Sequence, residues 1–457
     1  MLSSLLLVCL SLGVIGATFD DAVIYTVAEF VGLTGFLALE LRRISHMARA
    51  LVFLSLALPA YAFASGSFDA DLTLSALHRG AYLAFFLTSL SFLQHAAGRS
   101  PLILRSGQVL VMQPPGRRYL VLTFGAALFG MLLNLGTVGL LGTMIAKAVG
   151  PGDDAESTRI ANIRRKRMTL AMLRGFCALP MWSPMTITIA LVIAAIPSLS
   201  WGQMVIYSAP MTVLFLLIGW GLDRSGYARA PLPDQPPAPS LLKLLPLLTI
   251  VVLVPTTAFA ASQVLGTNLI TALLICIPFL SFGWIFIQER GAPTAGTLRK
   301  TAGIMGRDLL PSLPNMRTEI ALFACSAFIG VMVTASVDTV RLGHAIIALG
   351  LSADTLLVLS AWLVFGLSLM GISPIISVTI LAGTLPNLAA LEINEVVVGV
   401  MLLTVWTISV NATPFSAAVR MSARLVTVEP TLLGMRWNGL YCLISLGILS
   451  VFLLVAQ

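Results

Sequence analysis

The sequence predicts an all-α polytopic membrane protein with two repeated halves that contain discontinuous helices. The first observation is composition: 58% of the 457 residues are hydrophobic and 10% are charged, and the mean hydropathy is +0.97. A soluble domain carries roughly 25% charged residues, so this chain could not cover a water-facing surface. The second observation is that apolar runs of about 17–25 residues recur along the chain, and this is the length that crosses a bilayer as helix.

The apolar runs predict about 11 spanning helices and two re-entrant hairpins, and they leave no room for a soluble domain. Strands of a membrane barrel would instead alternate apolar and polar residues in segments of roughly ten. The chain is apolar from Met1 without a preceding basic residue, which favours a retained first helix over a cleaved signal peptide. We expect spans at about 2–18, 22–40, 47–65, 79–96, 168–196, 201–222, 244–262, 267–288, 353–386, 395–412 and 437–456.

The net charge of +8 resides in short loops between apolar runs, which is the orientation signal of a membrane protein rather than a sign of nucleic-acid binding. Basic clusters flank 118–146 on both sides, whereas the loops around Asp20 and Asp69 are acidic. We expect the protein to lie in a bacterial inner membrane. With the basic loops on the cytoplasmic side, the N-terminus is also cytoplasmic.

The apolar stretch 118–146 is expected to be the first re-entrant hairpin. A single crossing would put one of its two basic flanks outside, whereas a hairpin keeps both inside. Asn134-Leu135-Gly136-Thr137 provides polar and flexible residues for a tip. Two short ordinary helices with a loose turn are the alternative.

A Pro-rich linker at 231–243 separates an N-terminal half, 1–230, from a C-terminal half, 244–457. The halves look related: Arg117, Leu122, Ala127 and Gly130 each have an identical residue 200 positions later. This match predicts a second hairpin at about 318–351, in which Thr334 and Ser336 belong to the tip.

Each half also has a Ser-Pro pair within a spanning run, Ser183-Pro184 in 168–196 and Ser373-Pro374 in 353–386. A proline inside a helix removes one backbone hydrogen bond and clashes with the preceding turn, so we expect both helices to be broken. Broken helices free amides that attract anions and carbonyls that coordinate cations, and paired breaks favour a transporter site. Simple kinks in two packed helices are the alternative.

On these motifs the chain resembles the ion transporter superfamily, in particular its divalent anion–sodium symporters and the large membrane subunits of TRAP transporters. The resemblance implies that hairpin tips and unwound segments bind a carboxylate and sodium and move as an elevator. It implies a site formed by Asn134, Thr137, Ser183, Pro184, Thr186, Thr334, Ser336, Ser373, Pro374 and Ser377. Inverted halves require the second hairpin to enter the membrane from outside, yet the basic residues before it favour entry from inside. An alternative therefore stays open, in which 318–337 is a full span and the second hairpin lies at about 341–370.

Several other polar residues are candidates, because ionisable groups inside a membrane are costly. Arg174 could face an anion or extend to the surface; Asn411 and Thr413 could line the site or end a helix before Pro414. Glu29 and Asp338 could belong to a proton relay. Alternatively, Glu29 makes a helix-packing contact and Asp338 lies in a surface loop. The five cysteines are scattered among apolar residues and predict no metal site.

The sequence thus favours a secondary active transporter, and not an enzyme, for a small organic anion driven by sodium or protons, with no other cofactor. A cation–proton antiporter that uses Glu29 or Asp338 is the second hypothesis. A membrane-embedded enzyme or polysaccharide-handling protein would need larger outer loops. The expected partners are membrane lipid and the solute, with a homodimer, a solute-binding protein or a small membrane subunit left open.

Overall fold

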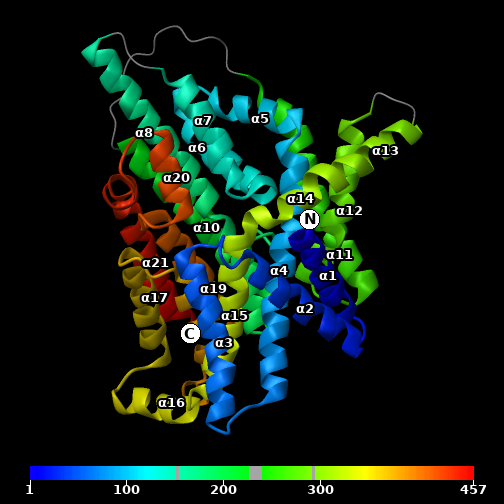
Figure 1. Ribbon diagram of the computed structural model, residues 1–457. Helices are drawn as coiled ribbons and strands as arrows, with labels where there is room; N and C mark the ends of the chain where they lie inside the picture. Colours follow the sequence, from blue (N-terminus) through cyan, green and yellow to red (C-terminus); the bar gives the residue numbers. More distant parts are fainter. Residues whose placement is uncertain (151–153, 226–238, 291–293) are drawn as a thin grey trace.

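The computed structural model describes residues 1–150, 154–225, 239–290 and 294–457 (Figure 1). Within these ranges every regular element is a helix, and nine helices are long and apolar enough to cross a membrane, or ten if one bent pair counts as a span. This confirms the predicted polytopic α-helical class. Seven of the nine coincide with expected spans, and the other two, Pro115–Leu133 and Gly296–Ser336, overlap the stretches expected as hairpins. The expected spans at 2–18, 79–96, 168–196 and 353–386 are not among the nine.

The first four helices are α1 (Leu2–Ala17), α2 (Val23–Glu40), α3 (His46–Ala64) and α4 (Ala70–Gly98). α1, α2 and α4 pack together, whereas α3 packs against the helix at 317–336. Glycines let α1 and α2 approach closely, since a Cβ on Gly32 would lie 2.7 Å from the Leu10 side chain. Small residues at such contacts are typical of helix packing in membranes, where water provides no hydrophobic driving force.

The stretch predicted as the first hairpin forms two helices joined by a tight turn, and its re-entrant course stays a prediction. After the short α5 (Pro101–Val111), α6 (Pro115–Leu133) ends at Asn134, and α7 (Gly136–Ala148) starts two residues later and packs back on both α5 and α6. Asn134 has φ +48°, a left-handed conformation that asparagine tolerates better than most residues.

The first predicted broken helix is confirmed. α8 (Ala155–Cys177) is followed by a single 3₁₀ turn, Leu179–Met181, and the chain regains helix only at α9 (Ile187–Ala195). Pro184 lies in the interrupted segment between them. A long helix, α10 (Trp201–Ser225), follows.

Residues 231–238 of the predicted linker lie outside the described residues. The chain then continues through a 3₁₀ turn, Leu241–Leu244, into α11 (Leu245–Leu265) and α12 (Leu269–Gln288), both as expected. Next come α13 (Thr294–Ile304), a π-helical turn, the one-turn α14 and a 3₁₀ turn, which together end at Met316.

The second hairpin is not at 318–351, and this part of the prediction is wrong. Residues 317–336 form one continuous helix, α15 (Arg317–Ser336), which packs against α3, α4 and α18. The short α16 (Thr339–Ala348) follows, with Asp338 as its N-cap. α6 and α15 have 19 and 20 residues and end near matching positions, but α7 packs back on α6 whereas α16 makes no comparable contact with α15. The alternative in which 318–337 is one continuous helix is therefore confirmed.

The polar turn of the second half lies between α17 (Ala353–Leu369) and α18 (Pro374–Thr384). α17 departs from α16 at an angle of 103°. After α18, the 3₁₀ turn at Ala389–Leu391 packs on α16 again, and a Cβ on Gly343 would lie 3.2 Å from that of Ala390. Both outer ends of the α17–α18 pair therefore lie beside α16, so the interruption at Ser373-Pro374 is the bend of a hairpin.

The chain ends with a second interrupted helix, α19 (Glu395–Ala412) and α20 (Ala417–Leu425), a π-helical turn (Leu432–Trp437) and α21 (Gly439–Ala456). The two halves pack across each other, because α7 lies against α20 and α9 lies against α18. In Figure 1 the first hairpin and α20 lie at the top, and α16 lies at the bottom.

Candidate functional site

The two interrupted helices share a local sequence pattern and one hydrogen bond. The first break reads Ser183-Pro184-Met185-Thr186 and the second Thr413-Pro414-Phe415-Ser416, a hydroxyl residue, proline, an apolar residue and a hydroxyl residue. In each, the first hydroxyl accepts a bond from the amide two residues later, at 3.3 Å. Both breaks are thus stabilised by their own side chains, which is typical of Ser and Thr in turns.

Four helices begin at these breaks and hairpin turns: α7, α9, α18 and α20. The N-terminal amides of a helix lack partners within the helix and carry a partial positive charge. Ser373 and Ser416 each cap one such end through an amide of α18 or α20, whereas no side chain caps the starts of α7 and α9. The amides of Thr137 and Val138 in α7 donate to the carbonyls of Asn134 and Leu135, so within the described residues the available donors of the first half are those at the start of α9.

The second break is bonded to the second hairpin. The Thr413 hydroxyl, which is buried, donates to the carbonyl of Ser368 in the last turn of α17, at 2.6 Å. The ring of Phe415 lies against Gly371, whose φ of +96° forms the bend. Thr413, which the sequence singled out, thus lies at the contact between the two turns, together with Ser368 and Phe415, which the sequence did not single out.

The predicted first tip contains an unsatisfied hydroxyl. Thr137 is fully buried, and its Oγ1 has no hydrogen-bond partner within the described residues. Thr407 and Ser409, in the last turns of α19, have buried hydroxyls in the same condition. A buried polar group without a partner costs free energy, so such groups are candidates to bind water or a ligand.

Thr334 and Ser336 lie in the last turn of α15 and form no hairpin tip. The Ser336 hydroxyl bonds back to the carbonyl of Met332 and the residue is exposed. Thr334 packs beside Gly383 of α18, with its Oγ1 buried and unpartnered. Ser377, one turn into α18, is 9% exposed.

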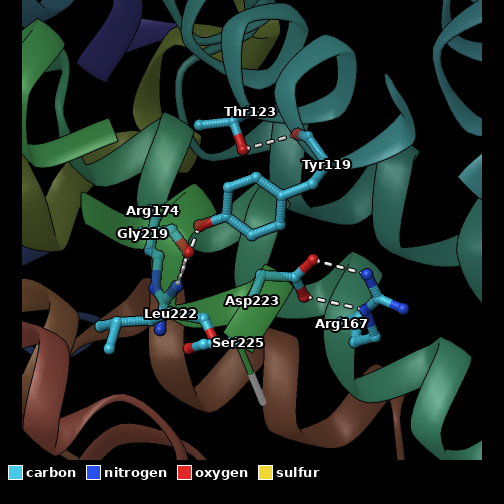
Figure 2. A network of polar contacts seen from close by, with 8 residues as sticks. All are labelled: Tyr119, Thr123, Arg167, Arg174, Gly219, Leu222, Asp223 and Ser225. Carbon is cyan, nitrogen blue, oxygen red and sulfur yellow. Dashed lines mark hydrogen bonds and ion pairs between the residues drawn. The ribbon is translucent and has the colours of Figure 1, made fainter. Parts of the chain in front are cut away.

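Arg174 is buried and contacts four elements. Its Nη1 donates to the Tyr119 hydroxyl of α6 at 2.9 Å and to the Gly219 carbonyl of α10 at 3.1 Å, as Figure 2 shows. Its Nε donates to Asn438 at 2.8 Å, and its guanidinium lies over the Tyr441 ring. All of these partners are neutral. Because the Arg174 side chain is buried, it does not extend to the surface, and that alternative is wrong.

Asn438 connects Arg174 to the second break. Its Oδ1 accepts from Arg174, and its Nδ2 donates to both the carbonyl and the side-chain oxygen of Asn411, at 3.1 and 3.2 Å. The Asn411 carbonyl would otherwise be left without a partner where α19 stops. No sequence motif marks Asn438, because the contact joins residues from distant segments.

Glu29 and Asp338 have structural partners. Both oxygens of the buried Glu29 carboxylate lie 3.0 Å from Nδ1 of His78, which joins α2 to α4 away from the four turns. Asp338 caps α16 through the amide of Arg341 and pairs with its side chain at an exposed position.

These features define a polytopic α-helical membrane protein with paired helix interruptions. No protein-family model and no curated protein matches the sequence. Among solved structures, the YdaH transporter of Alcanivorax borkumensis superposes with a TM-score of 0.52 at 15% identity, over 89% of this chain and 98% of that one. The MtrF antimetabolite efflux pump of Neisseria gonorrhoeae follows, with a TM-score of 0.49 at 13% identity over 90% and 96%. The chain therefore has the fold of a membrane transporter.

Proposed function

We propose that the protein is a secondary active transporter that moves a small organic anion, a carboxylate, across the bacterial inner membrane. The observation that carries the proposal is the start of four helices at two hairpin turns and two matching breaks. Helix N-termini favour anions, while the freed carbonyls and the hydroxyls of the breaks suit a sodium ion. Coupling to sodium or to protons follows from the absence of any ATP-binding motif in the chain.

The charge of the interrupted segments supports an anionic solute. The segments 134–135, 182–186, 370–373 and 413–416 contain no Asp or Glu. The buried Arg174 is bonded, by way of Asn438, to Asn411, two residues before the last of these segments. A cation–proton antiporter needs a titratable carboxylate at its ion site. Glu29 is bonded to His78 elsewhere and Asp338 is an exposed cap, so neither favours that function.

We further propose that the two halves are an inverted repeat and that the hairpins are re-entrant and move in an elevator mechanism. The support is the cross-packing of α7 with α20 and of α9 with α18, together with hairpins that open toward opposite ends in Figure 1. The basic loops lie at the end where the first hairpin opens, which favours a cytoplasmic N-terminus. The homodimer and the separate solute-binding or small membrane subunit stay predictions.

Uptake of labelled carboxylates into proteoliposomes, with and without a sodium gradient, tests the proposal. Thr413→Val keeps the shape of the side chain but removes the hydroxyl at the second break, and Ser183→Ala does the same at the first. We expect each to reduce uptake about tenfold or more. Thr249→Val is the matched control, because that hydroxyl bonds only to its own helix on α11.

Wild-type uptake in both break variants, with normal insertion, would remove the site assignment. Absence of uptake for every carboxylate, together with exchange of sodium for protons, would replace the anion transporter with the antiporter.

A further inference from the structure

Three arginines meet where α6 and α8 begin to run side by side. The two helices are parallel neighbours: a Cβ on Gly175 would lie 2.0 Å from the Thr123 carbonyl oxygen, and Leu179 contacts Gly130. Following both helices back from these contacts places the first turn of α6 beside the middle of α8. The Arg118 side chain extends further back, to the Gln113 carbonyl, toward the turn of α8 that contains Arg164 and Arg167. The charges of Arg164 and Arg167 act on Arg118.

These three cations have one carboxylate partner within the described part of the chain. Asp223 of α10 is bonded by Arg167 at 2.9 and 2.7 Å, through a paired contact seen in Figure 2. Arg118 is 8% exposed and donates its Nε to the Gln113 carbonyl at 2.6 Å, and no carboxylate of the described residues pairs with it. The Nε of Arg164 is buried and has no hydrogen-bond partner among the same residues.

The nearest acidic residues on α8 are already engaged. Asp154 caps the helix through the amide of Ser157, and Glu156 pairs with Arg159. The other two cations of this turn have neutral partners: Arg165 donates to the Val149 carbonyl and Lys166 lies over the Trp437 ring. Like charges held together at partly buried positions destabilise the folded protein unless an anion binds there.

We propose that Arg118 and Arg164 bind a phosphate-bearing anion, the headgroup of an anionic lipid or free inorganic phosphate. A guanidinium presents paired donors that match two phosphate oxygens, and lysine cannot reproduce this geometry. Basic pockets between membrane helices on the cytoplasmic side bind lipid headgroups in this way. The site is separate from the four turns, so it is independent of the transported solute.

Thermal unfolding of the full-length protein in nonionic detergent tests the site. The additives are phosphatidylglycerol, phosphatidylcholine and inorganic phosphate, at constant ionic strength. For the wild type we expect phosphatidylglycerol to raise Tm by about 5 °C more than phosphatidylcholine does. Arg118→Gln/Arg164→Gln should lose this difference. Arg159→Gln/Arg341→Gln, which removes the same charge at two exposed sites, should keep it.

A shift with inorganic phosphate that also disappears in the glutamine variant would identify the soluble ion as the ligand and support the site. Equal shifts with the two lipids in the wild type, or a phosphatidylglycerol shift that survives in the glutamine variant, would overturn it. If the glutamine variant does not fold, Arg118→Lys/Arg164→Lys keeps the charge, and phosphatidylglycerol binding should weaken about tenfold. Unweakened binding in that variant would likewise overturn the proposal.

Discussion

Replacing Arg174 by leucine should destabilise the protein by about 3–5 kcal/mol. The side chain makes three buried hydrogen bonds, to Asn438, Tyr119 and the Gly219 carbonyl, at 2.8–3.1 Å. A hydrogen bond to a charged group contributes about 1.5–3 kcal/mol, and the sum is reduced because burying an uncompensated cation is itself costly. Leucine would also leave the Asn438 oxygen without its donor.

The measurement is the free energy of unfolding in detergent micelles, compared among the wild type, Arg174→Leu and Arg174→Lys. Lysine keeps the charge but cannot bond to all three partners. We therefore expect the free energy of unfolding of Arg174→Lys to lie between those of the wild type and Arg174→Leu. Asn438→Asp is informative as well, because it keeps the acceptor for Arg174 and removes the donor to Asn411. An Arg174→Leu protein as stable as the wild type would refute this reasoning and show that the cation is retained at a cost to stability.

Gly175→Ala should lower the free energy of unfolding by about 3 kcal/mol, because the added Cβ would lie 2.0 Å from the Thr123 oxygen. A variant as stable as the wild type would contradict the close α6–α8 contact. His78→Ala should lower the free energy of unfolding by about 2 kcal/mol, because the buried Glu29 carboxylate loses its partner. The same substitution in a Glu29→Gln protein should cost less. Equal losses in the wild-type and Glu29→Gln proteins would show that the His78–Glu29 contact does not stabilise the fold. Hydrogen bonds from Ser157 hold the pKa of Asp154 below its usual value. The cap on α8 is therefore complete above the usual pKa of an aspartate and is lost as the pH falls through the lowered pKa of Asp154. Amide hydrogen exchange in the first turn of α8 should accelerate at acidic pH. Asp154→Asn should abolish this pH dependence.

The class of the fold could be predicted because it depends on the length and polarity of runs along the chain. The first hairpin could be predicted for a similar reason: basic flanks on both sides of 118–146 and the sequence Asn134-Leu135-Gly136 are local signals. The break at Pro184 was also local, since proline removes a backbone donor wherever it lies in a helix.

In the second half the predicted interruption at Ser373-Pro374 is present, since α17 ends at Leu369 and α18 begins at Pro374. It is the bend of a helix pair, and the closer counterpart of the Pro184 break, at Pro414, was not identified. Ser373-Pro374 shares only the dipeptide with the first break, whereas the four residues that start at Thr413 share the alternation of hydroxyl, proline, apolar and hydroxyl residues. That longer match was present in the sequence. Thr413 accepts the same amide bond as Ser183, but so does Ser373, from the amide of Ile375 at 3.4 Å. It is therefore the longer sequence match that distinguishes Thr413.

The contacts of Arg174 could not be predicted at all, and the reason bears on function. They join α6, α8, α10 and α21, so they depend on the tertiary arrangement and not on any local pattern. The resulting network connects the first hairpin, through Tyr119, to the second break, through Asn438 and Asn411. If the hairpins and breaks move together during transport, as we propose, this charge must move with them and must keep neutral partners throughout. A positive charge so close to the second break would repel a cation there unless an anion bound at the same time, which is the expected order of charges in a symporter of sodium and a carboxylate.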